Sequence, residues 1–118
     1  MDINIKLTED VTVVELAGDV DANTAPTVTE QVLPLAQPGS KILMDMTKVP
    51  YMSSAGLRSL LSLYRQTSAK DGKLVLVGLS EDIKDTMLVT GFLNFFTTCE
   101  TVDLGFAVLA WSKDPRLL

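Results

Sequence analysis

The fold is decided by residues 41–78, which begin with Lys41-Ile42-Leu43-Met44-Asp45 and continue, after a short loop, with Tyr51-Met52-Ser53-Ser54-Ala55-Gly56-Leu57-Arg58. The first run is short, apolar and bounded by turn residues, a pattern typical of a strand covered on both faces. The second run places two serines and two very small residues at the apparent start of a helix. A helix start carries unpaired backbone N–H groups and the positive end of the helix dipole.

A βαβ unit follows from the residues after this start. Apolar side chains recur at helical spacing and predict a narrow core-facing stripe of Leu57, Leu60, Leu61 and Tyr64. Asp71-Gly72 marks the end of the helix, and residues 73–78 form a second apolar run of the buried-strand type. Strand, helix and strand of these lengths predict parallel strands joined by a right-handed crossover.

The flanking segments extend this unit into one α/β domain. Alternating apolar residues predict a hairpin over residues 3–17 whose first strand is half-buried or at an edge. Thr24 before Pro26 predicts a helix that stops or kinks at Pro34, since an interior proline costs ~3 kcal/mol. A helix from Ser80 to Gly91 is expected to bury Ile83, Met87 and Leu88, and a short strand near 96–99 and a helix from Thr101 to Leu109 or Trp111 complete the domain. We expect a single domain over residues 1–118, with a mixed β-sheet of about four or five strands, about four helices and a flexible tail over 112–118.

The amino-acid composition limits the classes of protein to which this chain can belong. The 118 residues are 47 % hydrophobic, which suits one domain with a substantial core. No apolar run approaches the ~18 residues of a membrane span, and Met1-Asp2-Ile3-Asn4 lacks the features of a signal peptide. We therefore expect a cytoplasmic protein without membrane insertion.

The residue types that are scarce exclude several chemistries. There is no histidine, which removes the commonest general base and metal ligand. The single cysteine, Cys99, excludes an internal disulfide, and its neighbours fit a structural role. The net charge of −5, with ten scattered Lys and Arg residues, argues against nucleic acid. No catalytic residue, metal or cofactor is predicted.

The serine pair admits three interpretations. Local sequence favours a helix cap, worth ~1 kcal/mol over alanine, although Leu57 follows Ser54 where a capping box would need Glu or Gln. Ser54-Ala55-Gly56 also matches half of a hydrolase nucleophile elbow, but Met52 replaces the first glycine and no histidine can accept the proton. In the third interpretation the bare backbone suits close approach by another chain, and a phosphoserine there would add about −1.5 to −2 charges.

The whole chain resembles the STAS domain of bacterial anti-sigma factor antagonists. The resemblance runs from the hairpin through Gly18-Asp19-Val20-Asp21, residues 42–45, 51–58 and 73–78 to Thr90-Gly91-Phe92, and Ser53–Arg58 is its most specific part. It implies a non-enzymatic regulator that binds an anti-sigma factor which is also a serine kinase, thereby freeing a sigma factor. It also implies that this kinase phosphorylates a serine at the helix start and that a PP2C-type phosphatase reverses the reaction.

By position, the resemblance implies that Ser54 is the phosphoacceptor, with Ser53 as the alternative. Many family members have an acidic residue before the acceptor, and this chain has Ser53 there. The implied partner-binding residues are Asp19, Asp21, Ser53, Ser54, Ala55, Gly56 and Arg58. From the residues alone, Asp21 is more simply a solvated turn aspartate, and Asp45 a strand-end residue that orders the following loop.

Two other functions remain open. The main rival is a constitutive STAS-like structural subunit of a transport or signalling complex, in which the serines only cap the helix. Small-molecule binding is a weaker alternative, because no glycine-rich phosphate loop follows a strand.

Overall fold

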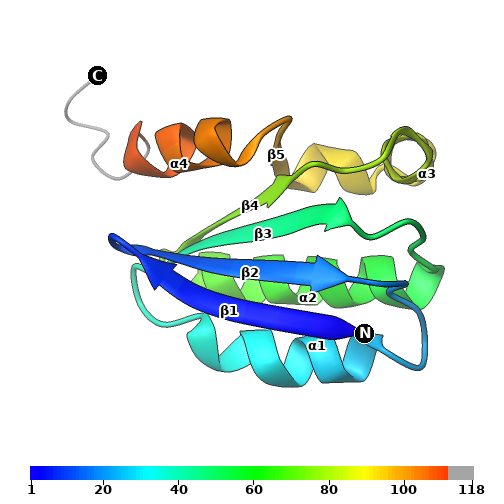
Figure 1. Ribbon diagram of the computed structural model, residues 1–118, viewed down its shortest axis with the longest axis horizontal. Helices are drawn as coiled ribbons and strands as arrows, with labels where there is room; N and C mark the ends of the chain where they lie inside the picture. The colour runs from blue at the N-terminus through cyan, green and yellow to red at the C-terminus, as the bar shows by residue number, and fades with distance from the viewer. Residues whose placement is uncertain (112–118) are drawn as a thin grey trace.

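Five strands form one mixed sheet whose order follows the chain (Figure 1). The computed structural model describes residues 1–111, and the tail predicted over 112–118 lies outside them. The strands are β1 (Asp2–Thr8), β2 (Val11–Ala17), β3 (Lys41–Lys48), β4 (Lys73–Val77) and β5 (Thr97–Cys99). β1 and β2 form an antiparallel edge hairpin, and β2 to β5 are parallel. The predicted α/β class, hairpin and mixed sheet are confirmed.

Each parallel strand is followed by a helix. These are α1 (Ala25–Val32), α2 (Ser54–Ala69), α3 (Glu81–Thr90) and α4 (Val102–Trp111). Two short 3-10 helices, η1 (Leu33–Leu35) and η2 (Phe92–Phe95), follow α1 and α3. α1 stops at Val32, as Pro34 predicts, because a proline ring clashes with the preceding helical turn. None of the helices described is long and apolar enough to cross a membrane.

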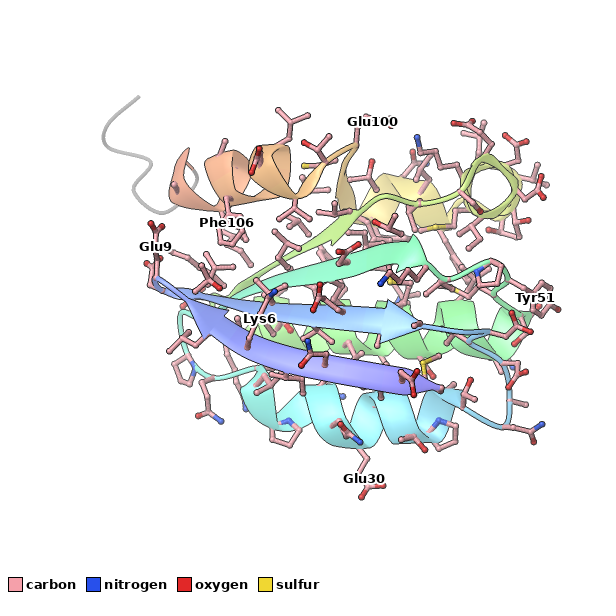
Figure 2. All side chains as sticks on the ribbon, viewed as in Figure 1. Lys6, Glu9, Glu30, Tyr51, Glu100 and Phe106 are labelled. Carbon is pink, nitrogen blue, oxygen red and sulfur yellow. The ribbon has the colours of Figure 1, made fainter. Side chains whose placement is uncertain are left out.

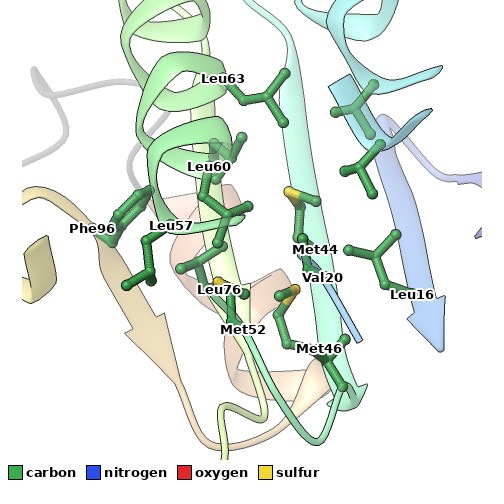
Figure 3. Packing of buried hydrophobic residues seen from close by; sticks show 14 of the residues in the cluster. Leu16, Val20, Met44, Met46, Met52, Leu57, Leu60, Leu63, Leu76 and Phe96 are labelled. Carbon is green, nitrogen blue, oxygen red and sulfur yellow. The ribbon is translucent and has the colours of Figure 1, made fainter. Parts of the chain in front are cut away.

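Strand β3 contributes to both sides of the sheet. Ile42, Met44 and Met46 point into the larger core cluster, which also holds the buried side chains of α1, α2 and α3 (Figure 3). Leu43 points the other way, into a smaller cluster with Val75, Val77 and Leu109 of α4. The prediction of a strand covered on both faces is confirmed, and β3 continues to Lys48.

Two details of helix orientation are wrong in the sequence-based prediction. Leu63 is fully buried, so the buried face of α2 is wider than the predicted stripe. α2 packs against α1 as well as the sheet, and a helix with neighbours on two sides buries a wider face. Leu88 is 63 % exposed, because only Ile83 and Met87 of α3 reach the core.

Candidate functional site

Two loops meet beside the start of α2, at the carboxyl ends of β2 and β3. Beyond the last sheet pairing, Val20 forms an isolated parallel bridge with Met52. The Val20 N–H donates to the Tyr51 carbonyl at 3.0 Å, and the Ser53 N–H donates to the Val20 carbonyl at 2.9 Å. The Asp19–Asp21 loop and the serine pair are therefore held side by side, at the right-hand end of Figure 1.

Ser53 is the cap of α2. Its backbone is extended (φ −79°, ψ 174°), and its Oγ accepts a hydrogen bond from the Gly56 N–H at 3.2 Å. Its carbonyl accepts from the Leu57 N–H at 2.9 Å, so two of the N–H groups in the first turn are satisfied. The capping interpretation is confirmed for Ser53.

Ser54 is the first helical residue and plays no part in the cap. It is exposed, and none of the side-chain hydrogen bonds found within residues 1–111 involves its hydroxyl. Over the same residues, the N–H groups of Ser54 and Ala55 have no protein acceptor. The structure thus leaves one serine hydroxyl accessible at the positive end of a 16-residue helix.

Gly56 is required by the approach of this protein's own loop. It is buried, and a Cβ at this position would lie 2.5 Å from the Val20 carbonyl oxygen and 2.8 Å from Cγ of Met52. Its small size was interpreted above as bare backbone for another chain to approach. Val20 already fills that space, so Gly56 shapes the site from within, whereas Ser54 lies on its surface.

The two loop aspartates have different environments. The half-buried Asp21 accepts through Oδ1 from the N–H groups of Asn23 at 2.9 Å and Thr24 at 3.2 Å. The Thr24 hydroxyl donates to the Asp19 carbonyl at 2.7 Å, which ties the two ends of the loop together. Asp21 thus stabilises the turn before α1 through its hydrogen bonds, while the Asp19 side chain is exposed.

Two further exposed side chains border the serine pair. Arg58 lies one helical turn after Ser54, on the same side of α2. Tyr51 was not predicted as a site residue; it is 54 % exposed and projects from the end of the molecule where α2 begins (Figure 2). The signal in the sequence was an aromatic residue in the short loop between the strand and the helix. The side chain of the next residue, Met52, is buried.

Asp45 bonds to Thr47, and both residues lie within β3, so the prediction that Asp45 ends the strand and orders the following loop is wrong. Asp45 Oδ1 accepts from the Thr47 N–H at 3.0 Å and also from the Thr47 hydroxyl. Asp45 itself lies inside β3, since the strand extends three residues beyond it. Within residues 1–111, no cluster of three or more Cys, Asp or Glu residues is arranged to hold a metal ion.

Comparison with known proteins gives the same family by sequence and by fold. The family described as STAS domain matches residues 2–105. The anti-sigma-B factor antagonist of Bacillus subtilis is 30 % identical over 91 residues, which cover 77 % of this chain and 84 % of that protein.

Three solved structures share the fold. An anti-sigma-factor antagonist (STAS) domain protein from Planctomyces limnophilus superposes with a TM-score of 0.84 at 17 % identity, covering 93 % of this chain and 99 % of that one. The anti-sigma factor antagonist SpoIIAA in its unphosphorylated form gives 0.71 at 15 % identity, covering 94 % and 99 %. The Bacillus SpoIIAA structure in the phosphorylated form gives 0.68 at 16 % identity, covering 91 % and 99 %. With a family match over nearly the whole chain and the same topology, this protein belongs to the STAS domain family.

Proposed function

We propose that this protein is an anti-sigma factor antagonist that acts in the bacterial cytoplasm as a non-enzymatic regulator. In its unphosphorylated form it binds an anti-sigma factor that is also a serine kinase, and phosphorylation of Ser54 releases that partner. A PP2C-type phosphatase restores the binding form. The curated relative in Bacillus subtilis carries this antagonist role in its name.

The division of roles between the two serines is the observation that carries this proposal. Ser53 is occupied as the helix cap, and its side chain is only half-exposed. Ser54 is exposed at the first helical position, where a phosphate group would face the unpaired N–H groups and the positive end of the helix dipole. The fold should therefore tolerate a phosphate on Ser54 without rearrangement.

The partner surface consists of exposed groups around Ser54. These are the Asp19 side chain, the Tyr51 ring and Arg58, together with the half-buried Ala55. Asp21 stabilises the loop, and Gly56 lets the loop lie against the helix start. Burying an uncompensated phosphate in this interface would cost ~3–5 kcal/mol, or roughly a hundred- to several-thousand-fold in affinity. That loss is large enough for a switch that involves no refolding. SpoIIAA, which shares this fold, has been solved in both phosphorylation states.

The test is phosphorylation by the purified anti-sigma factor kinase from the same organism with ATP, followed by mapping of the modified residue. Wild type and Ser53→Ala should gain one phosphate at position 54, and Ser54→Ala should gain none. Ser54→Ala should still bind the kinase, and Ser54→Asp should bind it poorly. Treatment with a PP2C-type phosphatase should restore binding of the phosphorylated wild type.

Strong phosphorylation of Ser54→Ala would overturn the site assignment. Absence of any binding between the wild type and the kinase would overturn the function itself. Unmodified protein that remains bound to a membrane complex in its own cells would instead favour the structural-subunit alternative.

A further inference from the structure

A groove of about 490 Å³ runs along the exposed side of α2, next to η2. Its lining is of mixed character. Leu61 and Phe92 form an apolar wall, Ser62 and Gln66 give polar edges, and Arg58 and Arg65 supply positive charge. Arg58 also borders the serine pair, so the groove is continuous with the surface around Ser54.

Both arginines of this groove lack an acidic partner in the described part of the chain. The ion pairs found among residues 1–111 use only lysines: Lys6, Lys41 and Lys84. Neither Arg58 nor Arg65 takes part in one, although the protein as a whole carries a net charge of −5. Two unpaired guanidinium groups beside an apolar wall are complementary to a segment with both carboxylates and apolar side chains.

The spacing of the arginines fits a helix. Arg65 is seven positions after Arg58, which places the two residues two turns apart, about 10 Å along the axis of α2. A partner helix lying along the groove would match both guanidinium groups with carboxylates at positions i and i+7. Apolar residues at i+3 and i+4 would lie between them, over Leu61 and Phe92.

We propose that this groove binds an acidic amphipathic helix of the anti-sigma factor. The inference rests on the proposed function for the identity of the partner, and on the groove itself for the chemistry of the segment. It also explains how a single modification could act beyond its own position. A phosphate on Ser54 would lie one turn from Arg58, where its negative charge would repel an acidic helix.

The first experiment measures affinity for the anti-sigma factor kinase. Arg58→Gln and Arg65→Gln should each weaken binding about tenfold, the loss of one interfacial charge pair. Lys70→Gln makes the same charge change at an exposed position of the same helix region but outside the groove, and should change affinity less than twofold. Ser62→Trp should block the groove, whereas Ser68→Trp, also exposed on α2 but outside the groove, should not.

The second experiment does not depend on the anti-sigma factor. The ¹⁵N-labelled protein is titrated with a helical peptide that has Glu at i and i+7 and Leu at i+3 and i+4, and with a matched peptide that has Lys in place of Glu. Only the acidic peptide should shift the amide signals of Arg58, Ser62, Arg65 and Phe92. These shifts should disappear in the Arg58→Gln/Arg65→Gln double variant.

The outcomes separate this inference from the proposed function. If wild type binds the kinase and the groove variants bind equally well, the groove assignment is wrong and the proposed function stands. If wild type fails to bind the kinase but the acidic peptide shifts the groove signals, the function fails and the groove chemistry stands. Concentration-dependent dimerisation that Arg65→Gln abolishes would reassign the groove to a contact between two copies of this chain and overturn the proposal.

Discussion

The Ser53 N–H donates a 2.9 Å hydrogen bond to the carbonyl of Val20, and this contact joins the loop after β2 to the start of α2. The same carbonyl lies 2.5 Å from the place where a Cβ on Gly56 would sit. The Val20 side chain is buried with Met46 and Met52 in the main core cluster (Figure 3). The Asp19–Asp21 loop is thus anchored to the protein interior beside the exposed groups around Ser54.

The two serines should differ in their effect on stability. Ser53→Ala removes the hydroxyl that caps α2 and should lower the free energy of unfolding by about 1 kcal/mol. Ser54→Ala removes an exposed hydroxyl with no partner among the described residues and should change it by less than about 0.5 kcal/mol. Urea unfolding followed by circular dichroism measures both. Equal destabilisation by the two substitutions would contradict the assignment of Ser53 as the cap.

Adding one methyl group at Gly56 should destabilise the protein, although alanine is the better helix former. The new Cβ would press on the Val20 carbonyl, which belongs to the backbone, and such overpacking costs about 1–3 kcal/mol. Gly105→Ala is the matched control in α4, where the new Cβ would meet the side-chain ends of Leu43 and Val77 at 2.8 and 2.9 Å. These contacts are with side-chain atoms rather than with backbone, so a smaller loss is expected in the same urea titration. A Gly56→Ala protein as stable as wild type would show that Val20 does not constrain this position.

Substitution of the two loop aspartates should have different effects on stability. Asp21→Ala removes the carboxylate that accepts from the Asn23 and Thr24 N–H groups and should cost about 0.5–1.5 kcal/mol of unfolding free energy. Asp19→Ala removes an exposed carboxylate and should leave stability within about 0.5 kcal/mol. Thermal unfolding and affinity for the anti-sigma factor are measured on the same samples. The assignment fails if Asp19→Ala unfolds more easily than Asp21→Ala.

Cys99 should make stability depend on pH in the alkaline range. Burial raises the pKa of this thiol, which packs beside the smaller core cluster. The folded state keeps its proton at a pH where the unfolded state loses it, so the contribution is present below the unfolded pKa of about 8.5 and is lost as pH rises through the folded pKa. Between pH 8 and 10 the wild type should therefore lose more unfolding free energy than Cys99→Ala. Parallel pH profiles for the two proteins would contradict this expectation.

The order of strands and helices was predictable because it depends on local geometry. Apolar runs such as 41–46 and 73–78 mark strands buried on both faces. Pro34 ends α1 because its ring clashes with the preceding helical turn. Burial of individual side chains was less predictable, as Leu63 and Leu88 show. The helical repeat of apolar residues gives the direction of a helix's buried face. The width of that face depends on which other elements pack against the helix.

The sequence by itself determined that a helix begins at the serine pair, that no histidine can activate either hydroxyl, and that the chain has the pattern of a STAS domain. Only the tertiary structure decided which serine caps the helix and which hydroxyl remains exposed. The reason is physical: the cap is the residue whose backbone is extended, and here the hydrogen bond from Ser53 to Val20, a residue distant in the sequence, fixes that position. The same contact makes glycine necessary at position 56, a requirement that no local pattern contains.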